Sequence, residues 1–231
     1  MSSTPLRSAA TPPVIVFDLD GTLVSSMDDL VVTLNVVLEA AGHEAIAPES
    51  VRTMVGHGAK VLLQRGLEAN GVAWTEDSLA PLYAHFLTYY EAHIADHTRP
   101  FSGVVDCLAR LRDRGFRLAV CTNKVERLTL PLLAALDLTW HFDAVVGGDT
   151  FERPKPDARP VLGAIERAGG MVTGSVMVGD SVTDIDAARA AGIPVVAVDF
   201  GYTPVPVRDL GPDRVISHFD DLEAALDELS V

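Results

Sequence analysis

Short apolar runs alternate with helical periodicity from residue 14 to the end of the chain, and this alternation limits the fold more than any other feature. The runs are uninterrupted and rich in β-branched side chains, as the buried strands of a parallel sheet are. Strands that alternate with helices imply parallel pairing through right-handed crossovers. The predicted fold is therefore α/β, a doubly wound parallel sheet with a Rossmann-like core. Strands are expected at 14–17, 117–121, 143–147, 175–178, 194–198 and 214–217, with helices at 102–114, 125–136, 157–168, 183–191 and 219–229.

One long segment contains only helical patterning. Between residues 27 and 97 there is no strand-like run, but three apolar stripes with helical spacing are separated by glycines and prolines. An insertion of this kind directly after the first strand predicts an all-helical cap domain on the α/β core. We therefore expect a flexible Ser/Thr/Pro-rich tail over 1–13, a catalytic core formed by 14–26 and 98–231, and a helical cap over 27–97.

Composition narrows the kinds of partner and the compartment. Of the 231 residues, 18 are basic and 32 are acidic, so the formal net charge is −14. Nucleic acids and anionic membranes are not expected as partners, because both are bound through clustered Lys and Arg. Cys107 and Cys121 lie in apolar stretches and predict reduced thiols in a cytoplasmic protein. We find neither a secretory signal nor a run of ~20 apolar residues. A monomer and a homodimer both stay open.

Polar side chains follow four of the predicted strands at the points where the strands end. Ligands of open α/β sheets bind outside the carboxyl ends of the strands. We therefore expect these groups to meet at one edge of the sheet, although the chain separates them widely. They are Asp18 and Asp20 after the first strand, Thr122 after the second, Lys155 beyond the third, and Asp180 and Asp184 after the fourth.

The chemistry follows from what these groups can do together. Asp18 and Asp20 are two positions apart, so extended backbone would point both carboxylates to one face. With Asp180 nearby, such carboxylates repel one another unless a cation lies among them. Hard oxygen ligands without His or Cys favour Mg²⁺. The Thr122 hydroxyl and the Lys155 ammonium suit a phosphoryl group. The predicted site thus holds an anionic group on a metal, beside a carboxylate able to attack it.

Each of these motifs also has a plainer interpretation. Taken alone, Asp-x-Asp-Gly is typical of a surface turn, and Thr-Asn after a strand is typical of a helix N-cap. A lysine between two prolines would ordinarily lie in a solvated loop, and the acids after the fourth strand fit the first turn of a helix. Their joint placement, each just past a different predicted strand, favours the functional interpretation.

The constellation resembles the haloacid dehalogenase superfamily, whose members are mostly phosphate-transferring hydrolases. Residues 18–23, Asp-Leu-Asp-Gly-Thr-Leu, resemble the first motif of that family. The insertion before the second motif is similar to the family's all-helical cap, and the resemblance covers nearly the whole chain from residue 14. The other three motifs are matched by Thr122, by Lys155, and by Gly179-Asp180 with Asp184.

The resemblance also implies a role for each motif residue. Asp18 would be the nucleophile that attacks phosphorus and carries a transient aspartyl-phosphate. Asp20 would protonate the leaving oxygen and then activate the hydrolytic water. Thr122 and Lys155 would hold the phosphoryl oxygens. The implied Mg²⁺ ligands are Asp18, the backbone carbonyl of Asp20, and Asp180. Asp184 would support these ligands without binding the metal itself.

Several shorter strings resemble one group within the superfamily, the phosphoglycolate phosphatases. They imply a small phosphorylated metabolite as substrate, and hydrolysis of 2-phosphoglycolate to glycolate and phosphate as the reaction. The strings occur at 55–59, 63–67, 122–124, 147–149 and 200–202.

The first of these strings has a physical rationale. Gly56 and Gly58 flank His57 just before a predicted helix, and a helix N-terminus with glycine-exposed N–H groups can bind an anion. We expect this loop, together with Arg65, to select the substrate carboxylate, and we expect Asn123 to contact the substrate. A simple turn between two cap helices is the alternative.

Two other functions share these motifs. A phosphosugar phosphatase or a β-phosphoglucomutase-like mutase would use the same core, and residues of the cap would decide between them. A non-enzymatic phospho-acceptor resembling a signalling receiver domain also uses Asp, Thr, Lys and Mg²⁺. Such a protein needs a much shorter chain and gains nothing from Asp20 or from a cap.

Overall fold

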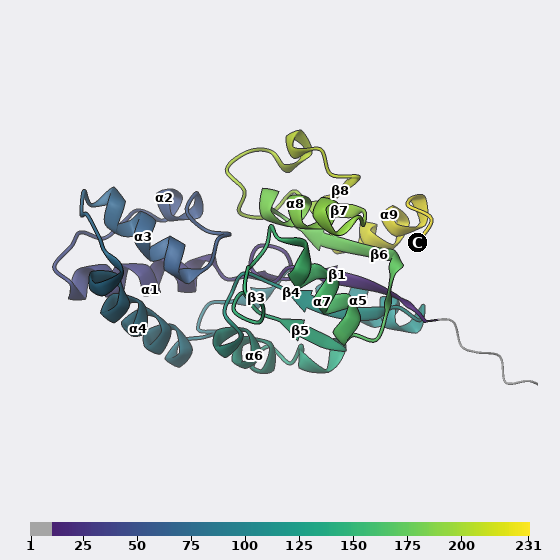
Figure 1. Ribbon diagram of the computed structural model, residues 1–231, viewed down its shortest axis with the longest axis horizontal. Helices are drawn as coiled ribbons and strands as arrows, with labels where there is room; N and C mark the ends of the chain where they lie inside the picture. Colours follow the sequence, from purple (N-terminus) through teal and green to yellow (C-terminus); the bar gives the residue numbers. More distant parts are fainter. Residues whose placement is uncertain (1–10) are drawn as a thin grey trace, which may run out of the picture.

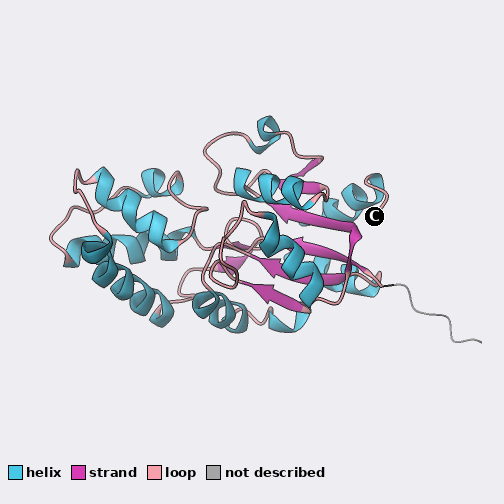
Figure 2. Ribbon diagram, viewed as in Figure 1, coloured by secondary structure: helices cyan, strands magenta, loops and turns pink. Residues whose placement is uncertain are grey.

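A parallel sheet forms the centre of the computed structural model, which describes residues 11–231. Its six strands lie in the order β5-β4-β1-β6-β7-β8, and every neighbouring pair is parallel. Helices cover both faces (Figure 1, Figure 2), so the predicted doubly wound α/β fold is confirmed. The strands are β1 (Pro13–Phe17), β4 (Arg117–Cys121), β5 (Ala144–Val146), β6 (Met171–Gly179), β7 (Val195–Val198) and β8 (Arg214–Ile216).

Alternate side chains of each strand point to opposite faces, which explains why the predicted runs are apolar throughout. In β1, Ile15 and Phe17 pack on one face, and Val14 and Val16 pack on the other. The first face is covered by α5 (Val104–Asp113), α6 (Glu126–Ala135) and α9 (Leu222–Glu228), and the second by α7 (Ala158–Arg167) and α8 (Val182–Ala191). Short 3-10 helices occur at η1 (Thr139–His141), η2 (Val207–Leu210) and η3 (Phe219–Asp221).

Four further helices form an apolar cluster of their own beside the sheet. Their buried side chains, among them Leu34, Leu63 and Phe86, pack mainly on one another. Figure 1 shows these helices at the left, and the strand arrowheads in Figure 2 point toward them. We call this part the four-helix segment. It consists of α1 (Met27–Ala40), α2 (Pro48–Arg52), α3 (Ala59–Ala69) and α4 (Glu76–Ala92).

The structure adds elements that the sequence patterns do not predict. β2 (Val24–Ser25) and β3 (Arg99–Pro100) pair antiparallel where the chain leaves the core and returns to it. Helix α2 begins at Pro48, which we expected to interrupt helices. Proline is favoured at the first helical position, because the N–H it lacks has no partner there. None of the helices in residues 11–231 has the length and apolar character that crossing a membrane requires.

Two predicted boundaries need correction, and one contact explains both. β1 begins within the predicted tail, because Pro13 is its first residue and the Pro12 carbonyl accepts a hydrogen bond from Met171 N. β6 begins at Met171 rather than at 175, because its added end pairs with Pro13. The rest of the predicted tail, residues 1–10, lies outside the described residues.

The strand order brings distant segments together. β1 lies between β4 and β6, so three strand ends that are far apart in the sequence are neighbours in space. The chain moves from β1 to β4 on one side and returns with β6 on the other, and open α/β sheets bind ligands at such a switch point. The residues that follow these three strands therefore lie between the sheet and the four-helix segment.

Candidate active site

Three of the predicted site residues meet at the central strand ends. Asp18 follows β1, Thr122 follows β4 and Asp180 follows β6, and all three are buried. The parallel register explains this meeting. Phe17 pairs with Val178, and the next residue, Asp18, still donates its N–H to the Val178 carbonyl at 2.9 Å.

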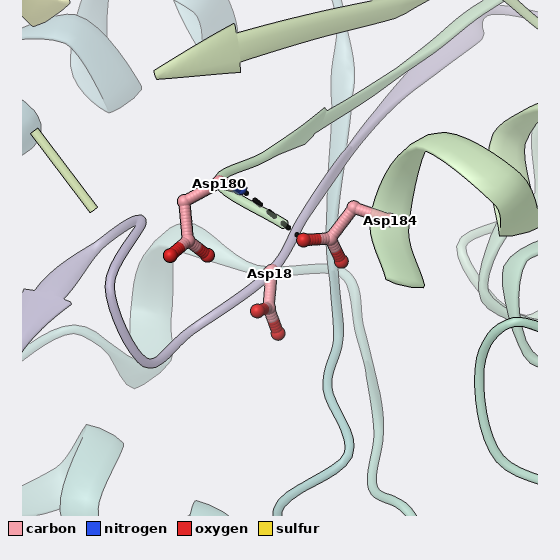
Figure 3. A group of neighbouring side chains, drawn as sticks. All are labelled: Asp18, Asp180 and Asp184. Atoms are coloured by element: carbon pink, nitrogen blue, oxygen red, sulfur yellow. Dashed lines mark hydrogen bonds between the residues drawn. The ribbon is translucent and has the colours of Figure 1, made fainter. Parts of the chain in front are cut away.

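Asp18, Asp180 and Asp184 form a cluster of carboxylates (Figure 3), in which one oxygen of each lies within 4.8 Å of the others. The Thr22 hydroxyl donates to Asp180 Oδ1 at 3.2 Å. The backbone N–H of Tyr202 donates to Asp180 Oδ2 at 2.7 Å. Asp180 is therefore fixed in place, with room for a further partner on its oxygens.

Asp184 is fully buried, and its oxygens are already used within the protein. Oδ1 accepts a hydrogen bond from Lys155 Nζ at 2.6 Å. Oδ2 accepts from Ser181 Oγ at 2.7 Å and from the backbone N–H groups of Asp180 and Ser181. The bond from the Ser181 N–H is one half of a capping box that starts α8. Because protein groups already bind both of its oxygens, Asp184 supports the other two carboxylates and has less to offer a metal ion.

Lys155 supplies the positive charge of this cluster. Its Nζ lies 2.9 Å from Asp18 Oδ1 and 2.6 Å from Asp184 Oδ1, and only 3% of the residue is exposed. Burial by itself would lower the pKa of Lys155, but the carboxylates of Asp18 and Asp184 more than offset burial, so the pKa is raised. One buried ammonium therefore contacts two of the three clustered carboxylates, and negative charge is in excess.

This excess of negative charge makes the cluster suitable for a cation. Burial raises the pKa of Asp18 to about 6, although Lys155 acts against the shift. The pKa of Asp180 is also raised well above its usual value, first by burial and then by Asp184 and Asp18. Asp18 Oδ1 is buried and accepts no hydrogen bond, even with Lys155 close by. Hard oxygen donors of this kind suit Mg²⁺, and Asp18 and Asp180 have oxygens to offer it.

Asp20 comes from the same strand end and lines the smaller cavity together with Asp18, but its carboxylate has partners of its own. Both oxygens accept hydrogen bonds from Lys124 Nζ at 3.0 Å, and Oδ1 also accepts from Ser26 Oγ at 2.6 Å. The chain turns at this point, and the Leu19 carbonyl accepts from the N–H of Leu23. The Asp20 carboxylate is therefore separate from the three-acid cluster, and its implied metal contact rests on its backbone carbonyl.

The loop before α3 lies against the strand ends. Asn123 Nδ2 donates to the Gly56 carbonyl at 3.2 Å and to the Lys155 carbonyl at 3.1 Å. Gly58, with a φ of +86°, approaches so closely that a Cβ there would lie 2.9 Å from the Asn123 carbonyl oxygen. The amide nitrogen of Asn123 thus holds the loop on the core. Asn123 also lines the smaller cavity, and its contact with the substrate stays a prediction.

Two cavities lie between the strand ends and the four-helix segment. The smaller, of about 40 Å³, has room for a few water molecules. The larger has a volume of about 150 Å³. Asp20 and Gly56 line both, so the cavities adjoin. The smaller is also lined by Asp18, Gly58, Tyr90, Thr122 and Lys124, and the larger by His57, Arg65, Asp180 and Tyr202.

His57 and Arg65 face the larger cavity together. Burial lowers the pKa of His57, and the charge of Arg65 lowers it further. Arg65 Nη1 donates to the Met54 carbonyl at 2.8 Å, which ties the guanidinium to the loop. The structure therefore brings two predicted substrate-binding residues to a cavity that Asp180 also lines.

The loop after β7 connects the acid cluster to the four-helix segment, and the sequence patterns assign it no contact. The Tyr202 hydroxyl accepts from the backbone N–H of Ser26 at 2.6 Å, at the start of α1. Gly201 packs so closely against Asp180 that any Cβ would collide with that side chain. Arg52 Nη2, from α2, donates to the Gly201 carbonyl at 2.8 Å.

The parallel sheet, the acid cluster at its centre and the inserted helices define one class of protein. A family model described as haloacid dehalogenase-like hydrolase matches residues 15–198, and the chain belongs to this family. A phosphoglycolate phosphatase of Agrobacterium fabrum is 46% identical over 228 residues, which are 99% of this chain and 96% of that protein. A phosphoglycolate phosphatase of Mesorhizobium japonicum is 47% identical over 216 residues, which are 94% of this chain and 95% of that protein. The crystal structure of a predicted phosphoglycolate phosphatase from Haemophilus somnus matches with a TM-score of 0.87 at 32% identity. The match covers 93% of this chain and 97% of that protein.

Proposed function

We propose that the protein is a Mg²⁺-dependent phosphomonoester hydrolase that converts 2-phosphoglycolate to glycolate and phosphate through an aspartyl-phosphate on Asp18. The observation that carries this proposal is the buried Asp18 carboxylate, in contact with Lys155 and beside Asp180. The names of the relatives support the substrate. A carboxylate in this setting can approach an anion, because neighbouring cations offset the repulsion between the two.

The chain's own residues account for both steps of the reaction. In the first, an oxygen of Asp18 forms a bond to phosphorus, while the bond from phosphorus to the ester oxygen breaks and that oxygen takes a proton from Asp20. In the second, Asp20 takes a proton from water, whose oxygen attacks the phosphorus of the aspartyl-phosphate. Phosphate leaves, and the Asp18 carboxylate is restored. Asp20 thus recovers the proton that it lost.

Thr122 and Lys155 would hold the phosphoryl oxygens during both steps. The Thr122 oxygen already accepts a backbone hydrogen bond, so the hydroxyl proton is free to point toward a ligand. Donors fixed in advance in this way are worth on the order of 10²–10³-fold in rate each. When bound by Asp18, Asp180 and the Asp20 carbonyl, Mg²⁺ would neutralise phosphoryl charge and make the phosphorus more electrophilic.

The four-helix segment would act as a cap that selects the rest of the substrate. The larger cavity is lined by Asp20 and Asp180 on one side and by His57 and Arg65 on the other. The Arg65 guanidinium and the backbone of residues 56–58 would hold the glycolate carboxylate there. Asn123 supports this role by holding the loop in place.

Metal binding should depend on pH in a defined direction. The raised pKa values of Asp18 and Asp180 mean that the metal-free folded protein loses stability as pH rises from about 4 through 6, since the unfolded chain ionises these groups more easily. Protons also compete with Mg²⁺ at low pH. We therefore expect Mg²⁺ to raise the midpoint of thermal unfolding more at about pH 7.5 than at about pH 5. Asp180→Asn should remove most of the increase, and the surface variant Asp186→Asn should keep it. Equal increases at both pH values would contradict the metal assignment.

The substrate proposal is tested by phosphate release from a panel of small phosphoesters, with and without Mg²⁺. We expect the highest kcat/KM with 2-phosphoglycolate. Arg65→Met should lower that value about 10- to 100-fold, the cost of one charge-assisted hydrogen bond. It should leave neutral phosphoesters nearly unchanged. A flat profile would contradict the substrate, and a maximum on a phosphosugar would favour the alternative phosphatase or mutase. The receiver-type alternative loses its support, because the chain belongs to a hydrolase family.

A further inference from the structure

A second buried lysine, Lys124, lies at the site and contributes to none of the steps described above. It follows the end of β4, only 6% of it is exposed, and its Nζ contacts three oxygen atoms. These are Asp20 Oδ1 and Oδ2, each at 3.0 Å, and the Tyr90 hydroxyl at 2.9 Å. An ammonium group has three N–H donors. All three are therefore used within the protein, and none is left to bind a phosphoryl oxygen.

The backbone of Lys124 is fixed as firmly as its side chain. Its N–H donates to Thr122 Oγ1 at 3.2 Å, and its carbonyl accepts from Gly148 N at 2.8 Å and from Thr129 Oγ1 at 3.2 Å. Burial would lower the pKa of Lys124, but Asp20 and Tyr90 more than offset burial and raise it. A charged group held at both ends is well suited to position a neighbour.

The two buried lysines contact different carboxylates of the site. Lys155 contacts Asp18 and Asp184, whereas Lys124 contacts Asp20. Asp20 is not part of the acid cluster that would attract the metal, and its carboxylate pairs with Lys124 instead. Asp20 lines both cavities, so Lys124 holds its carboxyl group beside the space that a substrate would fill.

Tyr90 extends this contact to the four-helix segment. It lies near the end of α4, its side chain is fully buried, and its hydroxyl is at the end of a ring that packs edge-on against Phe86. Lys124 Nζ also lies 4.4 Å from the centre of the Tyr90 ring. The position of the ammonium therefore depends on α4 being packed against the strand ends.

We propose that Lys124 is a positioning residue that orients the Asp20 carboxylate for proton transfer, and that Tyr90 makes this orientation depend on the docked four-helix segment. The inference rests on the proposed function, in which Asp20 protonates the leaving oxygen. It adds Lys124, a cation that acts on the reaction only through Asp20. It also adds Tyr90, through which the four-helix segment affects the position of Asp20.

The test compares two substrates that need the acid to different extents. The alkoxide leaving group of 2-phosphoglycolate requires a proton, whereas 4-nitrophenolate leaves without one. Lys124→Met should lower kcat/KM for 2-phosphoglycolate on the order of 10²-fold, the lower end of what acid–base catalysis contributes. The value for 4-nitrophenyl phosphate should change far less. Tyr90→Phe, which keeps the ring, should show the same pattern with a smaller loss. Tyr89→Phe, one position away on α4 with its ring stacked on His93, is the matched control and should change neither value.

A double variant shows whether Lys124 acts through Asp20. Adding Lys124→Met to Asp20→Asn should cause no further loss, because residues that act as a unit are not additive. Equal losses on both substrates in Lys124→Met and Tyr90→Phe would overturn the inference, since a merely structural role lowers both values alike. For Asp20→Asn the readout is the first step alone, the rate at which the leaving group is released in a single turnover, because the second step also needs Asp20. If that rate falls equally for both substrates, the proposed acid role of Asp20 is wrong. If Asp20→Asn keeps a fast first release of 4-nitrophenolate and Lys124→Met and Tyr90→Phe do not, only the inference on Lys124 is wrong.

Discussion

Asp18→Asn is expected to abolish turnover, with a fall in kcat on the order of 10⁴- to 10⁶-fold, as the loss of a nucleophile causes in other hydrolases with covalent intermediates. The amide has nearly the same shape as the carboxylate but cannot form the acyl-phosphate bond. Because Thr122, Lys155 and the cavity stay in place, the variant should still bind substrate. Steady-state phosphate release and substrate binding by calorimetry measure the two effects separately.

The fold of this variant should survive. Burial disfavours the charged form of Asp18, whose pKa is raised to about 6, so a neutral amide relieves that cost in the metal-free protein. Lys155 keeps its contact with Asp184. The midpoint of thermal unfolding without Mg²⁺ should therefore not fall below that of the wild type at about pH 7.5. Asp186→Asn, half exposed on α8, is the control and should keep full activity. Wild-type turnover in Asp18→Asn would contradict the nucleophile assignment.

Lys155→Met is expected to affect both activity and stability. It removes the buried ammonium from Asp18 and Asp184, and the loss of one partner of a buried ion pair costs about 3–5 kcal/mol of unfolding free energy. It also removes a cation held ready for the phosphoryl group, which should lower kcat/KM on the order of 10²–10³-fold. Both effects have the same cause, because the unpaired carboxylates repel one another and the incoming anion.

The stability defect of Lys155→Met should depend on pH. Lys155 lowers the pKa of Asp18, so without Lys155 the carboxyl groups take up protons more readily in the folded state. The variant should therefore be most destabilised at about pH 8, and the defect should shrink as pH falls toward about 5. Denaturant unfolding at several pH values measures the defect. Lys60→Met, which removes an exposed lysine paired with Glu76, should cost under about 1 kcal/mol at any pH. A defect that does not vary with pH would contradict the charge argument.

The meeting of Asp18, Thr122 and Asp180 could be predicted from the sequence for a simple reason. Strands buried on both faces appear as uninterrupted apolar runs, and in a parallel sheet the residues that follow such runs lie at one edge. Strand order was not needed for that prediction. The order β4-β1-β6 then brings these ends together at the centre of the sheet.

Side-chain directions could not be predicted in the same way. Asp18 and Asp20 both line the smaller cavity, but Asp18 contacts Lys155 and Asp20 contacts Lys124, and their spacing does not indicate these partners. The strand-end rule also covers Lys124, which follows Thr122 by two positions. Its partner Tyr90 could not be found from the pattern, because the apolar stripe of α4 identifies packing positions and does not show which hydroxyl reaches the core.

The most direct test of the account uses Asp20→Asn with 4-nitrophenyl phosphate and Mg²⁺. The leaving group departs without a proton, but the hydrolytic water lacks its base, so the covalent intermediate should accumulate. After quenching in acid, peptide mapping by mass spectrometry should place one phosphoryl group on Asp18 of nearly every molecule. A phosphoryl group on any other residue would contradict the account, as would continued release of 4-nitrophenol and phosphate with no phosphoenzyme.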